Sequence, residues 1–215
     1  MSVDEFYNSK YREVHNTGLT GIISRFSHRS LEKNISGSFS TVLELGAGDG
    51  FHSDYVKYFY DVYYETDIRI KNKLISNKMV SQYCDAEDIK KTFNDTKFDR
   101  ILMMCLICHL DKIELSLKSI ANQVNDGGLI SIYVPCEGGF FLSTARKLIT
   151  NPKTRRIGFD PIKINQLEHL HSYVKMKETI EEVYKNSKIT KKNYPFPFLS
   201  WKLNLWSVFQ VRVNL

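Results

Sequence analysis

The sequence predicts a single α/β domain whose β-sheet is mostly parallel. Residues Thr41 to Leu45 are β-branched or aliphatic apart from one acid, as in a strand covered on both faces. This strand runs into a turn with glycines at positions 46, 48 and 50, after which we expect a helix. The chain of 215 residues is long enough for one well-buried α/β domain and too short for two.

The composition is that of a globular protein. Hydrophobic residues make up 42% of the chain and charged residues 25%, and no apolar run approaches a membrane span. The N-terminus lacks the basic and then apolar pattern of a secretory signal, so we expect a cytoplasmic protein. The positive charge is local, because residues 139–192 hold 12 basic and 5 acidic side chains. This excess is either a solvated face or a rim for an anionic partner.

The cysteines predict neither disulfides nor a metal site. Cys84, Cys105, Cys108 and Cys136 lie in or beside apolar runs, which is typical of reduced thiols that behave as small hydrophobes. The segment 105–109 matches the C-x-x-C-H pattern of haem attachment, but it ends a very apolar strand and that chemistry normally needs export. A zinc site would need a second ligand pair at finger spacing, which the sequence lacks.

Helix and strand patterns alternate along the chain. Residues 3–33 have the spacing of one or two amphipathic helices broken near Thr17-Gly18, and a polar connector follows at 34–40. Their apolar face is predicted from Phe6, Val14, Leu19, Ile22, Ile23, Phe26 and Leu31. Further helices are expected at 51–60, 71–77 and 111–124, and strands at 61–67, 78–84, 98–110 and 129–134. Residues 187–193 and 203–213 are expected to pair as an antiparallel hairpin.

The glycine turn differs from two common nucleotide motifs. A dinucleotide fingerprint would need glycine at position 51, where Phe51 stands, and no Lys-Ser/Thr follows as in a P-loop. The remaining pattern, E-x-G-x-G-x-G from Glu44 to Gly50, resembles the first motif of class I S-adenosylmethionine-dependent methyltransferases. Later segments resemble further motifs of that family in the same order, across roughly residues 41–134.

This resemblance implies a Rossmann-like class I methyltransferase fold of about seven strands, mostly parallel with an antiparallel last strand, and helices on both faces. One methyltransferase domain would cover residues 1–215. Its parts would be an N-terminal helical lid (1–40), a cofactor-binding core (41–134), an acceptor-side insertion (135–186) and a C-terminal strand hairpin (187–215). By analogy with small methyltransferases, Tyr7, Tyr11 and His15 are candidate lid residues.

Contacts to S-adenosylmethionine follow from the motifs. Asp67 ends the predicted second strand, at the spacing from the glycine turn where α/β nucleotide binders place a carboxylate for ribose hydroxyls. Glu65 is the fallback if that strand ends earlier. The resemblance implies Asp85 and Ala86 at the adenine. The complete predicted set is Glu44, Gly46, Ala47, Gly48, Asp49, Asp67, Asp85, Ala86, Cys105 and Leu106.

Candidate catalytic residues lie after the fourth strand and in the insertion. His109 either accepts a proton from the methyl acceptor or only packs, and His169 and Glu137 are the next candidates for a general base. Arg155 and Arg156 suit a phosphorylated acceptor if they face the cleft. The predicted substrate-binding set is Arg155, Arg156, Glu168 and His171.

We therefore expect methyl transfer from S-adenosylmethionine to an oxygen or nitrogen of a small, anionic molecule. Glu168-His169 loosely resembles a pair in bacterial sugar- and envelope-modifying methyltransferases, which favours sugar nucleotides or envelope-polysaccharide precursors and a place in carbohydrate biosynthesis. Two alternatives stay open: an RNA methyltransferase that uses the basic insertion, and a non-catalytic cofactor-binding subunit of a methyltransferase complex. The sequence leaves the oligomeric state open.

Overall fold

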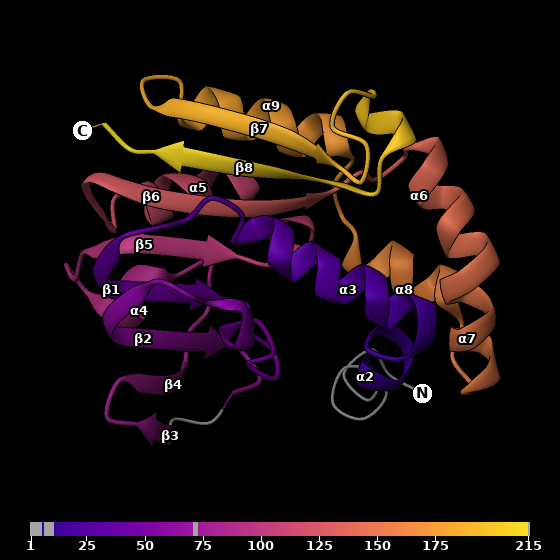
Figure 1. The fold of residues 1–215 in the computed structure, drawn as a ribbon, viewed down its shortest axis with the longest axis horizontal. Helices are drawn as coiled ribbons and strands as arrows, with labels where there is room; N and C mark the ends of the chain where they lie inside the picture. The colour runs from indigo at the N-terminus through magenta and orange to yellow at the C-terminus, as the bar shows by residue number, and fades with distance from the viewer. Residues whose placement is uncertain (1–5, 7–10, 71–72, 215) are drawn as a thin grey trace.

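A computed structural model of the chain describes residue 6, residues 11–70 and residues 73–214. Its centre is an eight-stranded sheet in the order β3-β4-β2-β1-β5-β6-β8-β7 (Figure 1). The strands are β1 (Ser38–Leu45), β2 (Phe59–Asp67), β3 (Lys73–Ser76), β4 (Met79–Tyr83), β5 (Phe98–Met103), β6 (Val124–Pro135), β7 (Lys188–Tyr194) and β8 (Trp206–Arg212). Strands β4, β2, β1, β5 and β6 are parallel, whereas β3 and β8 run antiparallel to their neighbours. The predicted mostly parallel sheet with an antiparallel last strand is confirmed.

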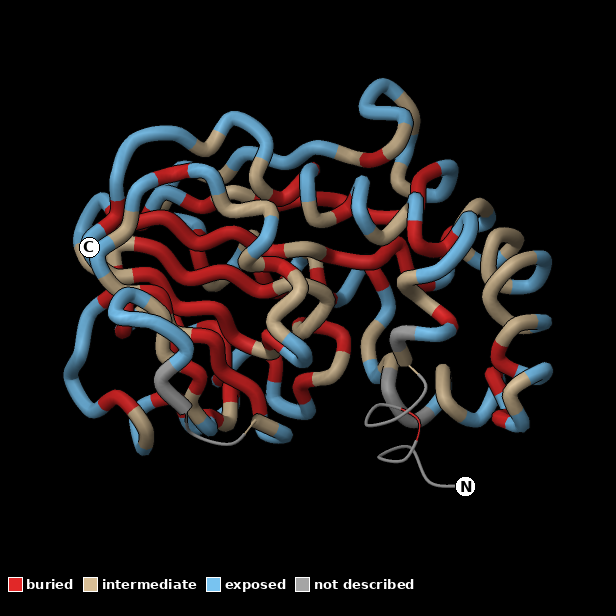
Figure 2. The backbone as a smooth tube through the Cα atoms, turned by 60° about the horizontal axis from the view of Figure 1, so that its bottom comes forward, coloured by how far each residue is buried: buried red, intermediate tan, exposed pale blue. Residues whose placement is uncertain are grey.

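Helices cover both faces of the sheet. One face carries α4 (Ile89–Phe93), α5 (Ile113–Ala121) and α9 (Tyr173–Val183), and the other carries α3 (Gly18–Leu31), which crosses in front of the strands in Figure 1. Beyond the carboxyl ends of the parallel strands lie α2 (Tyr11–His15), α6 (Phe140–Ala145), the π-helical η4 (Arg146–Thr150), α7 (Asn151–Arg156) and α8 (Pro161–Glu168). Figure 2 shows that the central strands are buried and that the outer connections are exposed. No helix in the described part of the chain is both long and apolar enough to cross a membrane.

The predicted helix at 51–60 is wrong. A short 3-10 turn, η2 (Ser53–Tyr55), is followed by β2, which begins at Phe59. The aromatic run Tyr58-Phe59-Tyr60 favours extended structure, and residues 51–58 alone are too few for a full crossover helix. The glycine turn is therefore connected to the next strand by a short 3-10 turn and not by a full helix.

The predicted helix at 71–77 is also wrong. Residues 73–76 form β3, which pairs antiparallel with β4 across a turn at Asn77-Lys78. Leucine and isoleucine at 74 and 75 precede an asparagine that favours turns, which is a hairpin pattern. This edge hairpin is why the sheet has eight strands. Strand β5 likewise ends at Met103, before the predicted end at 110, and the chain continues into the 3-10 turn η3 (Ile107–His109).

The break predicted at Thr17-Gly18 separates α2 from α3, and Gly18 has a positive φ of 55°. The predicted apolar face of α3 is wrong for Leu19, Ile22 and Phe26, which are 54%, 58% and 42% exposed. Short side chains such as Thr20 and Ser27 are buried instead. They face the cavity described below, where long apolar side chains would fill the space.

Polar contacts fix the carboxyl end of α3 to the sheet. The indole Nε1 of Trp206 donates to Ser30 Oγ at 2.8 Å, and the Gln210 amide donates to the Leu31 carbonyl at 2.9 Å. Both partners come from β8, and the ring of Phe26 contacts the Trp206 ring with centroids 5.5 Å apart. This half of α3 is therefore part of the rigid body of the domain.

Candidate functional site

A cavity of about 1030 Å³ lies at the carboxyl ends of the parallel strands. Its walls are α2 and the inner face of α3, the glycine turn after β1, the segments after β2, β4 and β5, and helices from α6 to α8. Ligand pockets usually measure about 300–1,000 Å³, so this cavity has room for a cofactor and a small second molecule.

The glycine turn gives the cavity a floor of bare backbone. Gly46, Gly48 and Gly50 have φ angles of 72°, 58° and 77°, in the left-handed region that favours glycine. An added Cβ at Gly50 would lie 2.9 Å from Glu65 Oε1, whereas one at Gly48 would meet nothing within 4 Å. The Gly48 position is therefore open for a ligand, as a cofactor that lies against the turn requires.

Asp67 joins the end of β2 to this turn. Its Oδ2 accepts from the Gly48 N–H at 3.0 Å, and its Oδ1 accepts from the Arg69 N–H at 2.9 Å. Each carboxylate oxygen can accept a further bond, so the predicted ribose contact remains compatible with this geometry. Strand β2 ends at Asp67 as expected, and Glu65 packs against Gly50 outside the cavity.

Glu44 is a buried acid in the floor of the cavity. Its side chain lies on β1 with only 1% of the residue exposed, and the Tyr63 hydroxyl donates to its Oε2 at 2.7 Å. Burial raises the pKa of Glu44 to about 7. A cationic group of a ligand would favour its ionised form.

The whole predicted cofactor set lines the same cavity. All ten residues line the cavity: Glu44, Gly46, Ala47, Gly48, Asp49, Asp67, Asp85, Ala86, Cys105 and Leu106. Their individual contacts to S-adenosylmethionine remain predictions. Cys105 has a φ of 60°, and its thiol lies with the donor atoms of Cys108 and His109 within 4.8 Å. This trio is a group among the described residues that can hold a metal ion, and we assign no metal to the site.

Next to Cys105, the cavity-lining rings of His109 and His169 are in edge-to-face contact, with centroids 5.3 Å apart. Behind them, Glu137 bonds His169 Nδ1 with Oε1 and accepts from both terminal nitrogens of Arg146. Burial alone would raise the pKa of Glu137, but the hydrogen bonds from His169 and Arg146 outweigh it and lower the pKa to about 2. Glu137 is therefore ionised. It does not line the cavity itself, but it holds the cavity-lining side chains of His169 and Arg146 in place.

Two of the candidate lid residues also reach the cavity. Tyr11 and His15 of α2 line the cavity with their rings stacked 4.5 Å apart. Burial, with a smaller contribution from Arg146, lowers the pKa of His15 to about 4, and burial raises the pKa of Tyr11. Tyr7 lies outside the described residues.

Lys153 of α7 ties the insertion to the junction of α2 and α3. Its Nζ donates to the Val14 carbonyl at 3.2 Å, the Thr17 carbonyl at 2.8 Å and Thr20 Oγ1 at 2.8 Å. The N-terminal segment and the insertion thus form one continuous wall of the cavity.

Three of the four predicted substrate-binding residues, Arg155, Arg156 and His171, do not line the cavity. Arg155 and Arg156 are exposed at the end of α7 and do not line it. His171 bonds the Leu110 carbonyl at 2.6 Å, also outside the cavity, and the side chain of Glu168 lies outside the described part of the chain. Arg146 is the cavity-lining arginine of the insertion. Nothing in the local sequence distinguishes it, because its partner Glu137 comes from the preceding loop.

The fold and the site together define a class of protein. A glycine turn after a central parallel strand, and a carboxylate at the end of the neighbouring strand, are the arrangement with which Rossmann-like proteins bind nucleotide-containing cofactors. The sequence matches the family described as a methyltransferase domain over residues 11–183, and the chain belongs to this family. It is a methyltransferase with S-adenosylmethionine as the methyl donor.

Solved structures share the fold. One is in the complex between the Haloferax volcanii Trm112 methyltransferase activator and the putative methyltransferase, with TM-score 0.66, 11% identity, and coverage of 100% of this chain and 98% of that chain. The plantazolicin methyltransferase BpumL, crystallised with SAH, has a TM-score of 0.65 and 11% sequence identity, and the match covers 99% of this chain and 94% of that chain. A possible histamine N-methyltransferase from Thermotoga maritima has a TM-score of 0.61 and 14% sequence identity, and the match covers 97% of this chain and 98% of that chain. Among curated proteins, none matches the sequence.

Proposed function

We propose that the protein methylates an oxygen or nitrogen of a small, hydroxyl-rich acceptor, with His169 as the general base. The observation that carries this proposal is the contact between Glu137 and the cavity-lining His169. Bound S-adenosylmethionine supplies a methyl group that is already electrophilic. The protein has to orient the acceptor, exclude water and remove one proton.

The protonation of His169 follows from its neighbours. Because Glu137 is ionised, it accepts a hydrogen bond, so His169 Nδ1 carries the proton when the ring is neutral. The lone pair of a neutral ring is then on Nε2, where it can accept the proton of an acceptor hydroxyl. Arg146 also bonds Glu137, and its Nη2 lies 3.1 Å from the same His169 Nδ1, so both partners limit the positions that His169 can adopt. His109 is the second candidate, since its ring contacts that of His169.

The nearby wall supports a polar acceptor. Thr150, Asn151, Thr154 and Asn165 line the cavity with neutral hydrogen-bonding side chains. The Oδ1 of Asn151 is buried and has no hydrogen-bond partner among the described residues. A buried oxygen without a partner costs about 1–3 kcal/mol, which a hydroxyl or amine of the acceptor would recover. Sugars offer such donors in number.

For the acceptor we favour a sugar nucleotide or a polysaccharide precursor. Its sugar would fill the cavity, and its phosphates would extend toward the exposed basic side chains of the insertion, such as Arg155 and Arg156. An RNA methyltransferase is the second candidate, because the same exposed side chains can follow a phosphate backbone.

Transfer of labelled methyl groups into a fractionated extract of the source cell tests the acceptor class. Label in nucleotide-linked sugars is the expected result, and label in RNA would contradict it and favour the second candidate. Turnover by the purified chain alone would rule out a purely non-catalytic role. No transfer without a second protein would contradict independent catalysis.

The base is tested by His169→Ala and His109→Ala. We expect His169→Ala to slow transfer by about 100- to 10,000-fold with SAH affinity retained, and His109→Ala to have a smaller effect of the same kind. Lys163→Ala is the matched control, because Lys163 is exposed on α8, the helix that ends directly before His169, and does not line the cavity. Loss of SAH affinity in step with the rate would instead make His169 a binding residue.

A further inference from the structure

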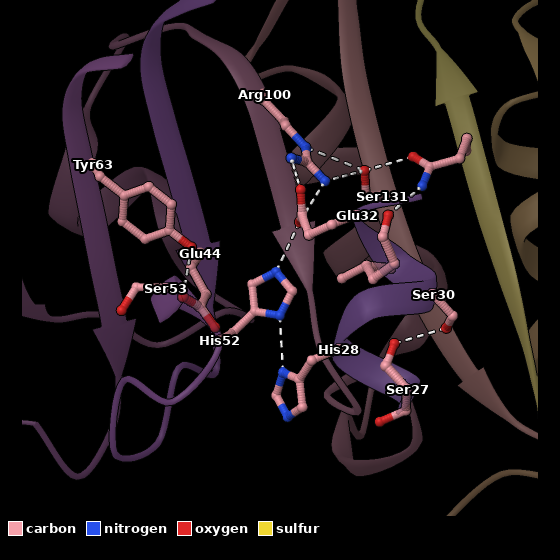
Figure 3. Close-up of polar contacts among 12 residues, drawn as sticks. Ser27, His28, Ser30, Glu32, Glu44, His52, Ser53, Tyr63, Arg100 and Ser131 are labelled. Carbon is pink, nitrogen blue, oxygen red and sulfur yellow. Dashed lines mark hydrogen bonds and ion pairs between the residues drawn. The ribbon is translucent and has the colours of Figure 1, made fainter. Parts of the chain in front are cut away.

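A chain of buried polar contacts runs from the middle of the sheet to the cavity (Figure 3). It begins at Arg100 on β5, which is fully buried. The guanidinium donates to both carboxylate oxygens of Glu32 at 2.8 and 2.9 Å, and also to Ser131 Oγ at 3.0 Å. Glu32 is the C-cap residue of α3, directly after Leu31. The buried pair therefore fixes the position of the Glu32 carboxylate.

Two histidines continue the chain. His52 Nε2 lies 2.8 Å from Glu32 Oε1, and His52 Nδ1 lies 2.9 Å from His28 Nδ1. His52 is 1% exposed, and both rings line the cavity next to the glycine turn. Figure 3 shows His28 at the end of the chain, with its other ring nitrogen turned away from His52.

The charges of the network fix where the protons are. Arg100 already balances the charge of Glu32, so the pair needs no further cation from the buried His52. A neutral His52 must donate to the carboxylate through Nε2, which leaves its Nδ1 as an acceptor. His28 then donates through Nδ1. The Nε2 of a neutral His28 carries a lone pair and no proton.

Aromatic contacts hold the His28 ring in this orientation. It stacks on Tyr55, with centroids 5.2 Å and planes 19° apart, and meets the edge of Phe51 at 5.1 Å. Burial, with a smaller effect of His52, lowers the pKa of His28 to about 3, so the ring stays neutral at ordinary pH. In many α/β proteins the N-terminus of a long helix supplies polar contacts beside the glycine turn. Here only the short η2 follows the turn, so side chains such as His28 supply polar groups at this place.

We infer that His28 Nε2 accepts a hydrogen bond from the α-ammonium group of S-adenosylmethionine. This inference rests on the cofactor and not on the identity of the methyl acceptor. A lone pair attracts an ammonium group and repels a carboxylate, so it selects the amino group of the methionine end. Glu44 also lines the cavity and offers a second acceptor for that ammonium. His28 is thus a binding residue, and Arg100, Glu32 and His52 are positioning residues.

Calorimetry with truncated ligands tests the assignment. We expect His28→Ala to weaken binding of SAH by about 10- to 100-fold, the usual value of a hydrogen bond to a charged group. Binding of the SAH analogue without the α-amino group should change less than about twofold, and binding of 5′-methylthioadenosine likewise. Equal losses for all three ligands would overturn the inference. The inference would also be overturned if His28→Ala weakened binding of every ligand that keeps the α-carboxylate, including the analogue without the α-amino group.

Two further variants separate binding from support of the fold. His28→Gln places an amide oxygen near the position of Nε2, and His28→Asn places its amide near Nδ1, where it can only reach His52. We expect His28→Gln to bind SAH more tightly than His28→Asn. The reverse order would mean that the contact to His52 matters and would overturn the inference. If the wild-type chain binds 5′-methylthioadenosine but not SAH, the His28 assignment fails alone, whereas binding of neither ligand refutes the cofactor assignment itself.

Discussion

Replacing Glu44 by glutamine should stabilise the unliganded protein above neutral pH. Burial raises the pKa of this carboxyl from 4.5 to about 7, so the folded state keeps its proton to higher pH than the unfolded chain does. Stability is therefore lost as the pH rises from 4.5 to about 7 and is not regained above it. Each tenfold change in the ionisation constant is worth about 1.4 kcal/mol, so the ionised carboxylate costs about 3 kcal/mol.

Glu44→Gln removes this cost and keeps the side-chain oxygen that accepts from Tyr63. For a domain of this size, about 3 kcal/mol corresponds to a rise in Tm of about 6–12 °C. We expect this difference between variant and wild type near pH 8 and only a small part of it near pH 5. Affinity for SAH should fall in the same variant, because the glutamine has no charge to attract the ammonium group.

Thermal unfolding of both proteins at the two pH values is the measurement. Asp61→Asn is the matched control, because Asp61 is an exposed acid on β2, and its Tm difference from wild type should not depend on pH. A Glu44→Gln difference of equal size at both pH values would refute the reasoning, since it would show that Glu44 is ionised in the folded state at low pH too.

Three further outcomes are expected. Asp67→Ala should weaken cofactor binding by about 1–3 kcal/mol, and unchanged SAH affinity in calorimetry would contradict its ribose role. Arg100→Met should destabilise the fold by about 3–5 kcal/mol in urea unfolding, because it leaves a buried carboxylate without its partner; a loss under about 1 kcal/mol would contradict this account. Gly50→Ala should destabilise the fold by up to about 1 kcal/mol more than Gly48→Ala, because a Cβ at Gly50 meets the carboxylate end of Glu65, a side chain that can shift. Equal unfolding midpoints for the two alanine variants would count against that contact.

The parts of the fold that were predictable from sequence depend on local patterns. The E-x-G-x-G-x-G motif placed the turn, and the acid at the end of the next strand placed Asp67 beside it. Short connections were harder to predict. The segment 51–58 has helix-compatible residues, but the sheet needs the next strand at Phe59, and this tertiary requirement prevails over local propensity.

The parts of the site that were missed depend on long-range pairs. Glu32 and Arg100 lie 68 residues apart, and neither stands in a motif. His28 and His52 are likewise single histidines in the sequence, and only the folded chain shows that they are in contact. The apolar spacing of α3 indicated the wrong face because the helix borders a cavity, where the inner face carries small polar residues. Amphipathic spacing assumes a packed core on one side and water on the other.

The polar contacts that fix the carboxyl end of α3 have a consequence for the rate of turnover. A helix held by Trp206, Gln210 and Arg100 cannot swing open as a unit. An opening of the cavity at α2 would then have to bend the chain near Gly18 and break the Lys153 contacts to Val14, Thr17 and Thr20. Release of product and entry of substrate would share this step. Lys153 would thus limit how fast the enzyme can cycle without touching the methyl group.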